Sequence, residues 1–261
     1  MNEFDPGPTL DFAEHFAQVP DYAPFKEHFW YDWGPIFYRG RLDGTARVLC
    51  IASDPGATER IALRTLVGDA GQRTQGFLAK IGLTRSYLCL NAFAYGLMPS
   101  HASKGARILR DPEQLAWRNA LYTKSLNPNL QVIIAFGEQA QDAVGLWGGK
   151  GTVPVIAIPH PSSRDSKKLA NEWRNTVTQL RVLVTPDSDG NPSLPNYGSE
   201  LQESDYAPIP KRDLPFGLPD WFGDDAWGRR ATPVHVNSVN RPKNNSKNGL
   251  SWIAPRSGID V

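Results

Sequence analysis

Three polar residues with useful chemistry stand at or near the ends of apolar segments. Asp54 directly follows ARVLCIAS, Asn91 lies inside SYLCLNAFAY, and His160 directly follows VPVIAIP. Aspartate is disfavoured within strands and the next two residues are Pro-Gly, so Asp54 is expected where a buried strand reaches the surface. Because parallel strands bring their carboxyl ends to one sheet edge, we expect a carboxylate, an amide and an imidazole to line one pocket.

Each of the three residues also has an ordinary structural interpretation. Asp54 could cap the following turn, Asn91 could bond to neighbouring backbone, and His160 could be a surface residue before a proline. The joint pattern favours a catalytic or binding site more strongly than any one member does.

The segments that would position these residues alternate in character along the chain. Apolar runs typical of buried strands occur at 46–53, 86–95, 130–137 and 153–159, and helical patterns at 68–83, 111–126, 138–147 and 166–184. Asp111 can cap the second of these helices and Pro112 suits its first turn. The alternation predicts an α/β fold with three layers, α/β/α, around a central, mainly parallel four-stranded sheet.

The composition changes near residue 185, which predicts two regions. Residues 1–184 are expected to form the α/β domain, with an aromatic lead-in over 1–45. Residues 185–261 are expected to form an irregular Pro/Gly-rich extension packed on that domain, with a mobile basic end. The extension also carries Phe216, Trp221, Phe222 and Trp227, and a free tail would rarely contain so many large aromatic residues.

The bulk composition narrows the class of protein. Forty per cent of the 261 residues are hydrophobic, and the net charge of +1 neither requires nor excludes a nucleic-acid partner. No stretch approaches the roughly 18 apolar residues of a membrane span, and the N-terminus lacks the features of a signal peptide. Cys50 and Cys89 lie in apolar runs, where they are expected to be buried and cannot form a four-cysteine metal site. We therefore expect a soluble, reduced, cytoplasmic protein without a membrane partner.

Three short motifs resemble those of the uracil-DNA glycosylase superfamily. ASDPGA at 52–57 is similar to the family's GQDPYH or its Pro-Gly variant, LCLN at 88–91 to LLLN, and HPSS at 160–163 to HPSP or HPSS. The segment at 66–83 resembles the corresponding part of the thermostable iron–sulfur branch. The resemblance covers about residues 45–184. It implies a monomeric, monofunctional glycosylase of the bacterial cytoplasm and nucleoid that excises uracil from single- or double-stranded DNA and needs no metal or other cofactor.

The resemblance also implies roles for the three polar residues. Asp54 would stabilise the sugar cation and orient or deprotonate the attacking water. The amide of Asn91 would donate to uracil O4 and accept from N3–H, an edge that cytosine reverses. His160 would donate to uracil O2, where negative charge grows as the bond breaks.

Further contacts to the base follow from the same motifs. Ser53 lies in the first motif, and Gly56 stands where most members carry a tyrosine that blocks the thymine methyl, which opens the pocket. Leu66 occupies the position of a stacking phenylalanine in the iron–sulfur branch, and Phe93 or Tyr95 could stack instead.

Contacts to the DNA backbone are expected from the last motif. The hydroxyls of Ser162 and Ser163 suit phosphate oxygens, and Arg164 stands where a residue would fill the gap left by the flipped base. Backbone N–H groups of 54–57 could form an anion nest. Two other functions stay open: a glycosylase with a broader range of deaminated or mismatched bases, and a protein that binds uracil or abasic sites with little turnover.

Overall fold

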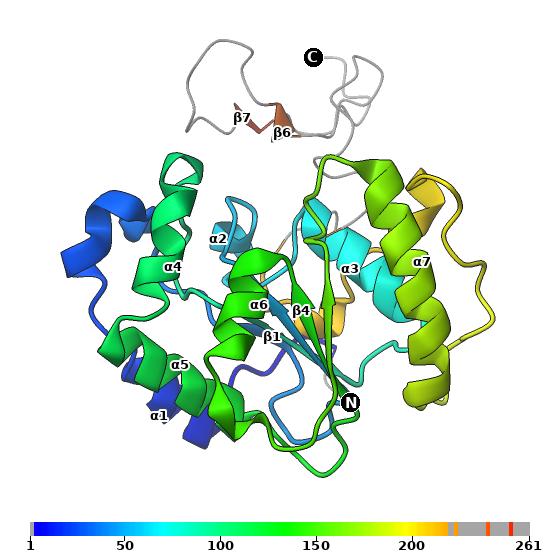
Figure 1. Cartoon of the computed structure of the whole chain (residues 1–261), viewed down its shortest axis with the longest axis horizontal. Helices are drawn as coiled ribbons and strands as arrows, with labels where there is room; N and C mark the ends of the chain where they lie inside the picture. Colours follow the sequence, from blue (N-terminus) through cyan, green and yellow to red (C-terminus); the bar gives the residue numbers. More distant parts are fainter. Residues whose placement is uncertain (1–2, 219–221, 224–238, 241–250, 253–261) are drawn as a thin grey trace.

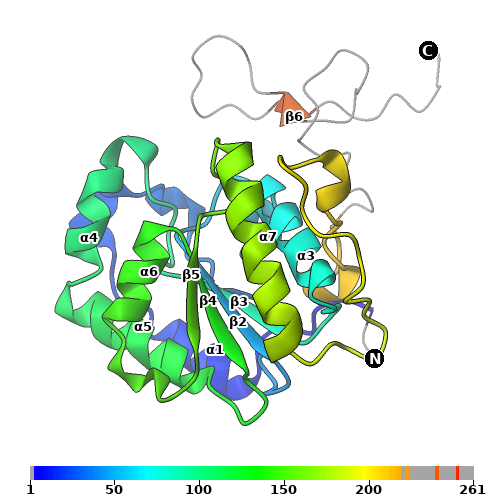
Figure 2. The same ribbon diagram turned by 45° about the vertical axis from the view of Figure 1, so that its right-hand side comes forward.

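The structure of the chain is a computed structural model that describes residues 3–218, 222–223, 239–240 and 251–252. Figure 1 shows a central sheet flanked by helices, and Figure 2 shows the two helical layers from the side. The strands are β1 (Tyr38–Gly40), β2 (Val48–Ala52), β3 (Tyr87–Asn91), β4 (Val132–Phe136), β5 (Val155–Ile158), β6 (Val239–Asn240) and β7 (Ser251–Trp252). The α-helices are α1 (Leu10–Ala17), α2 (Glu59–Ala62), α3 (Asp69–Lys80), α4 (Gly105–Ile108), α5 (Pro112–Lys124), α6 (Glu138–Gly145) and α7 (Ser166–Leu183). Short 3₁₀ helices are η1 (Ala23–His28), η2 (Tyr31–Trp33), η3 (Pro99–Lys104), η4 (Gly148–Lys150), η5 (Glu203–Asp205) and η6 (Lys211–Asp213).

The main sheet has the strand order β1-β3-β2-β4-β5, in which β3, β2, β4 and β5 run parallel. The predicted three-layer α/β/α fold is confirmed, and the four predicted strands are these four. The sheet has a fifth strand that the sequence reading assigned to the aromatic lead-in: β1 pairs antiparallel with β3. Its three residues are too few to show a strand pattern, and its central Arg39 is buried only because distant residues pair with it.

Alternating residues of the parallel strands pack into two hydrophobic cores, one on each face of the sheet. In β2, Leu49 and Ile51 face the layer of α1, α4, α5 and α6, while Val48, Cys50 and Ala52 face α3 and α7 (Figure 2). A strand buried on both faces reads as a continuous apolar run, which is why these strands were visible in the sequence.

Two local sequence signals act as predicted. The Asp111 side chain accepts hydrogen bonds from the backbone N–H groups of Glu113 and Gln114, with Pro112 at the first position of α5. Cys50 and Cys89 are buried, free, and paired in register between β2 and β3.

The first part of the C-terminal extension packs against the α/β core beside α3 and α7 (Figure 2). Asp187 accepts from the backbone N–H groups of Thr84, Arg85 and Ser86, and Asp205 forms an ion pair of 2.9 Å with Lys80 of α3. Phe222 is buried, but Phe216 is 83% exposed and touches only the edge of the Phe4 ring among the aromatics described. Trp221 and Trp227 lie outside the described residues, as does the predicted basic end apart from the residues of β6 and β7.

Within the described residues, no helix has the length and apolar character needed to cross a membrane.

The buried carboxylate of Asp213 ties the extension to the sheet edge. It accepts from Arg39 Nη1 at 3.1 Å and Tyr87 Oη at 2.7 Å, and it also contacts Arg41. Because Asp213→Ala would leave the buried guanidinium of Arg39 without its carboxylate, we expect the free energy of unfolding to fall by about 3–5 kcal/mol.

Urea denaturation of Asp213→Ala measures this loss. The control is Asp189→Ala in the same extension, whose solvent-facing carboxylate accepts from Thr84 Oγ1 at 2.7 Å and lies 3.8 Å from Arg85, and this variant should lose much less stability than Asp213→Ala. Equal losses for the two variants would contradict the anchoring role of Asp213.

Candidate active site

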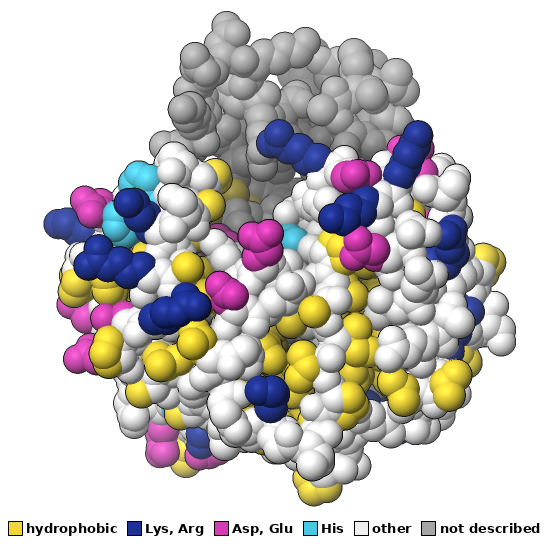
Figure 3. Space-filling model, viewed as in Figure 1, with side chains coloured by type: hydrophobic (Ala, Val, Ile, Leu, Met, Phe, Trp, Pro, Cys, Tyr) yellow, Lys and Arg dark blue, Asp and Glu magenta, His cyan; other side chains and the backbone are white. Residues whose placement is uncertain are grey.

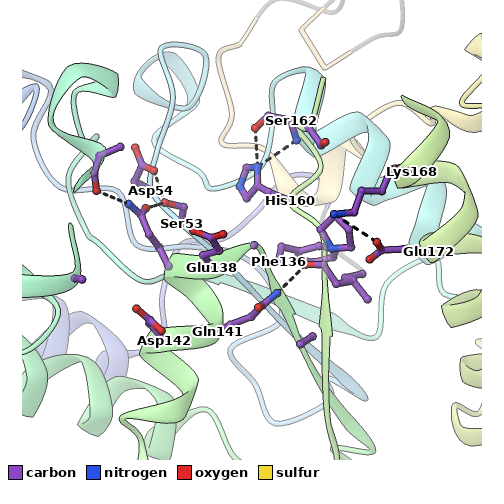
Figure 4. Close-up of a pocket in the computed structure, with 18 of the residues that line it drawn as sticks. Ser53, Asp54, Phe136, Glu138, Gln141, Asp142, His160, Ser162, Lys168 and Glu172 are labelled. Atoms are coloured by element: carbon purple, nitrogen blue, oxygen red, sulfur yellow. Dashed lines mark hydrogen bonds and ion pairs between the residues drawn. The ribbon is translucent and has the colours of Figure 1, made fainter. Parts of the chain in front are cut away.

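The parallel register brings the predicted residues to one edge of the sheet. Ser53 and Asp54 follow β2, and His160 follows β5 after one intervening proline. All three line a single cavity of about 930 Å³, together with Gly137 at the end of β4. Figure 4 shows Asp54 and His160 projecting from different strand ends into the same opening.

Asp54 is held by two hydrogen bonds. Its Oδ2 accepts from the backbone N–H of Leu97 at 2.9 Å, and its Oδ1 lies 2.6 Å from Ser53 Oγ. Burial of the carboxyl group raises its pKa to about 6, with a smaller contribution from the negative charge of Glu59, while both hydrogen bonds oppose the rise. At neutral pH the carboxylate is therefore ionised but close to its pKa, which suits a general base.

Gln139, in the first turn of α6, is a site residue that the sequence did not reveal. Its Oε1 makes a short contact with Ser53 Oγ, and its Nε2 donates to the carbonyl of Ala102 at 3.3 Å. The Ser53 hydroxyl has one proton and faces two acceptors, Asp54 and Gln139. When Gln139 takes that proton, the contact between Ser53 and Asp54 needs a proton on Asp54. Competition from Gln139 therefore weakens the hydrogen bond by which Ser53 opposes the rise in the Asp54 pKa.

The hydrogen bonds of His160 fix its tautomer. The backbone N–H of Ser162 donates to Nδ1 at 3.1 Å, and Ser162 Oγ lies 2.7 Å from the same atom. Because a backbone N–H can only donate, Nδ1 of the neutral ring is an acceptor and the proton sits on Nε2. Burial lowers the His160 pKa to about 4, so the ring is neutral at pH 7. Nε2 is buried without a partner and is a donor ready for a ligand.

The loop that carries His160 is held from three sides. Gly137 has φ +81°, and a Cβ there would lie 2.8 Å from the Cβ of His160, so the close approach requires glycine. Arg73 of α3 donates to the carbonyls of Pro161 and Ser163 at 2.8 and 3.3 Å. Trp173 of α7 donates to the carbonyl of Pro159 at 3.2 Å. These contacts position the imidazole from neighbouring elements.

The Asn91 side chain is a second buried polar group at this edge of the sheet without hydrogen-bond partners among the described residues. The residue is 7% exposed, and neither Nδ2 nor Oδ1 has a hydrogen bond. It pairs in register with Ala52 and so shares the sheet face that carries Phe136 and Ile158, two residues that line the cavity. Asn91 itself does not line the cavity, so the expectation that all three polar residues line one pocket holds for Asp54 and His160 only. An unpaired buried polar group costs about 1–3 kcal/mol, which an incoming ligand with matching groups would offset.

The remaining predicted residues lie at different depths. Ser162 and Ser163 line the cavity, Arg164 is exposed just beyond it, and Gly56 is exposed on the turn after β2. Leu66 is buried on the same sheet face as Asn91, whereas Phe93 is buried on the opposite face against Phe29. The roles proposed for all of these stay predictions. Phe136, which the sequence reading did not select, is an aromatic side chain in the cavity wall.

The predicted anion nest is partly occupied by a protein carboxylate. Glu59 Oε2 accepts from the N–H of Gly56 at 3.0 Å, and Oε1 accepts from Val67 and Gly68 at 2.8 and 2.9 Å. The buried glutamate thus links the Pro-Gly turn to the start of α3. A Cβ at Gly56 would lie 2.8 Å from Glu59 Oε2, so a larger side chain there would have to displace the glutamate.

The charges around the opening are uneven. Glu138 and Asp142, one helical turn apart on α6, line the same cavity, and acidic side chains gather over this helix in Figure 3. On α7, Lys168 lies 3.9 Å from Glu172. The carboxylates of the α6 wall would repel phosphate groups.

The chain matches the model of a known protein family. The model of the uracil DNA glycosylase superfamily matches residues 39–181, which is more than half of the chain. The matched range contains the four parallel strands together with Asp54, Asn91 and His160. No curated protein matches the chain.

The shared proton of Ser53 gives a direct prediction. In Gln139→Leu the competing acceptor is gone, so Ser53 can donate to Asp54 throughout. Because this stabilises the ionised carboxylate, the Asp54 pKa should fall below its wild-type value of about 6. Carboxyl ¹³C NMR titration measures both values. Gln141→Leu is the control, since Gln141 lines the cavity but bonds to the carbonyl of Ile158. An Asp54 pKa that rises or stays unchanged in Gln139→Leu would rule out the competition.

Proposed function

The chain belongs to the uracil DNA glycosylase superfamily, and we propose that it hydrolyses the N-glycosidic bond of flipped-out deoxyuridine in DNA as a monofunctional enzyme of base excision repair. The observation that carries this proposal is a set of three buried polar atoms without partners: Asn91 Nδ2, Asn91 Oδ1 and His160 Nε2. They offer two donors and one acceptor, and uracil offers two carbonyl oxygens and one N–H.

Asn91 would read the base. Its Nδ2–H₂ would donate to uracil O4 and its Oδ1 would accept from N3–H. Cytosine presents an amino donor and a ring acceptor on the same edge, so both buried groups of Asn91 would face the wrong partner. A site built for particular hydrogen bonds rejects an analogue that cannot make them by about 10⁴–10⁵.

Asp54 and His160 would act on the bond itself. As the bond from C1′ to N1 breaks, its electron pair moves onto the uracil ring, and His160 Nε2–H would bond to O2, where the charge grows. The Asp54 carboxylate would stabilise the positive sugar and take a proton from the water that attacks C1′. The products are an abasic site and free uracil.

A broader range of bases is a second candidate, and Gly56 favours it. The residue is exposed on the turn after Asp54, and Glu59 occupies the space into which a side chain at this position would first extend. No bulky side chain can therefore stand there to exclude a methyl group at C5 of the base without rearrangement. Mismatched thymine and other deaminated bases are then additional substrates.

The other parts of the proposal concern the setting of the reaction. We propose that residues 1–184 form the catalytic domain, with 185–261 as an extension packed on it. The enzyme would act as a monomer on single- or double-stranded DNA in the bacterial cytoplasm, at the nucleoid. Ser162, Ser163 and Arg164 would contact the DNA backbone, which the positions of these residues at and beside the cavity support.

Incubation with an oligonucleotide containing one uracil, followed by alkali and a denaturing gel, tests the function. Cleavage at the uracil supports the glycosylase, and parallel strands containing mismatched thymine test the broader range. A heat-stable shifted band without cleavage, or no product at all, would contradict a hydrolytic uracil glycosylase.

Asp54→Asn is expected to lower the single-turnover rate by about 10²–10⁴ while DNA binding survives. In the wild type, the rate should rise about tenfold per pH unit below the Asp54 pKa of about 6 and level off above it, because the ionised form is the base. Asp142→Asn, which removes an exposed carboxylate from the same cavity, should behave as wild type. A rate for Asp54→Asn within threefold of wild type would remove Asp54 from the mechanism.

Asn91→Asp is expected to shift the choice of base. A protonated aspartic acid can present the reversed edge to cytosine, whereas an ionised carboxylate lacks the donor that uracil O4 needs. Uracil excision should therefore weaken and cytosine excision should become detectable. If the variant removes uracil as fast as the wild type under single-turnover conditions, Asn91 does not read the base.

A further inference from the structure

An aromatic surface lies beside the catalytic turn, built largely from residues that precede the family match. The rings of Trp30 and Trp33 stack with their centroids 5.4 Å apart and their planes 8° apart. The guanidinium of Arg60, an exposed residue of α2, lies 5.9 Å from the centre of the Trp33 ring. We call Trp30, Trp33 and Arg60 the aromatic platform.

The platform is packed directly on the backbone that orients Asp54. A Cβ at Gly96 would lie 3.2 Å from two ring carbons of Trp33 and 2.7 Å from the carbonyl oxygen of Pro55. The backbone N–H of Trp30 donates to the carbonyl of Gly96 at 2.8 Å, and the next residue, Leu97, donates to Asp54. A nucleotide bound at Asp54 would therefore have the platform as a near neighbour.

The indole N–H groups distinguish the platform from the other tryptophans described. Trp117, Trp147 and Trp173 each donate to a protein oxygen at 3.0–3.2 Å. Among the described residues, nothing accepts from the indole N–H of Trp30 or Trp33, and both side chains are partly exposed. Partly exposed, stacked indoles with a cation beside them are the means by which proteins hold bases of single strands.

The charge distribution gives an independent reason to place the DNA strand here. Glu138 and Asp142 make the α6 wall of the opening acidic (Figure 3), so phosphates cannot run along it favourably. The hydroxyls of Ser162 and Ser163 lie after the end of β5. The platform packs against the segments that leave the ends of β2 and β3. A strand that passes from the serines over Asp54 reaches the platform next.

We propose that the aromatic platform stacks a base adjacent to the flipped nucleotide and so favours single-stranded DNA. This rests on the proposed function, because Asp54 marks where the flipped nucleotide lies. In a single strand the neighbouring base is free to stack on Trp30 or Trp33, and Arg60 can approach the phosphate between the two nucleotides. In a duplex the same base is already paired and stacked.

The test measures binding without chemistry. A fluorescently labelled single strand carries one central tetrahydrofuran abasic analogue, which cannot be cleaved. In the reference strand thymines flank the analogue on both sides. In two further strands, abasic spacers replace the thymines on one side or on the other. Replacing the flanking bases on the platform side should weaken wild-type binding about tenfold, within the range for one stacked base. Trp33→Leu should bind the base-bearing strand about tenfold more weakly and should not respond to the spacers.

Two further variants separate stacking from a structural role. Trp117→Leu removes a tryptophan of α5 whose ring stacks on that of His15, with the ring centroids 5.2 Å apart. This variant should keep the wild-type affinity and the wild-type response to the spacers. Arg60→Gln leaves the rings intact and should reduce the slope of log affinity against log salt by about 0.7, the value for one phosphate contact on a single strand. If Trp33→Leu perturbs folding, Trp30→Leu and Arg60→Gln carry the test.

The proposed stacking would be contradicted if Trp33→Leu responded to the spacers as the wild type does. It would also be contradicted if wild-type affinity did not depend on the flanking bases on either side. The uracil cleavage assay on the same proteins keeps the two proposals apart. A response to spacers without cleavage would retain the platform and reject the glycosylase. Cleavage without that response would do the reverse.

Discussion

The parallel register of the central sheet is the constraint on which the site depends. Pairing of β2 with both β3 and β4, and of β4 with β5, places the segments after these strands at one edge. The Ala52–Asn91 pair puts the amide on the sheet face that carries Phe136, and Phe136 lines the cavity although Asn91 does not. A slip of one residue in β3 would turn Asn91 to the other face and bury it among α4, α5 and α6. The same constraint makes Gly137 necessary, because its neighbour across the strand ends is His160.

Burial then gives the two titratable groups opposite roles. The same loss of solvent raises the pKa of Asp54 to about 6 and lowers that of His160 to about 4, because in both cases it disfavours the charged form. Above about pH 6 the site holds an ionised carboxylate and a neutral imidazole that donates from Nε2. In the proposed reaction, the carboxylate would accept a proton from the attacking water and the neutral donor would bond to the departing uracil anion.

The features of the fold and the site that depend on local sequence pattern are predictable from the sequence. Strands buried on both faces, the Asp111 cap and the polar residues after the strands were all predictable, because each rests on a few consecutive residues. Features that depend on residues far apart in the chain are not predictable in this way. Strand β1 is three residues long and holds a buried Arg39 that is paired by Asp213, 174 positions away. Gln139 meets Ser53 across 86 positions, and the face on which Phe93 is buried depends on how the chain leaves β3. No sequence periodicity reports such contacts.

The central claim is that the unpaired groups of Asn91 and His160 form the surface that recognises uracil. Addition of free uracil and of free cytosine to ¹⁵N-labelled protein, followed by ¹H–¹⁵N NMR, tests it without DNA and without turnover. Uracil should shift the side-chain amide signals of Asn91 and the Nε2–H signal of His160 in a saturable manner, and cytosine at the same concentration should not. Shifts of equal size with both bases, or uracil shifts that leave these two side chains unaffected, would contradict the account.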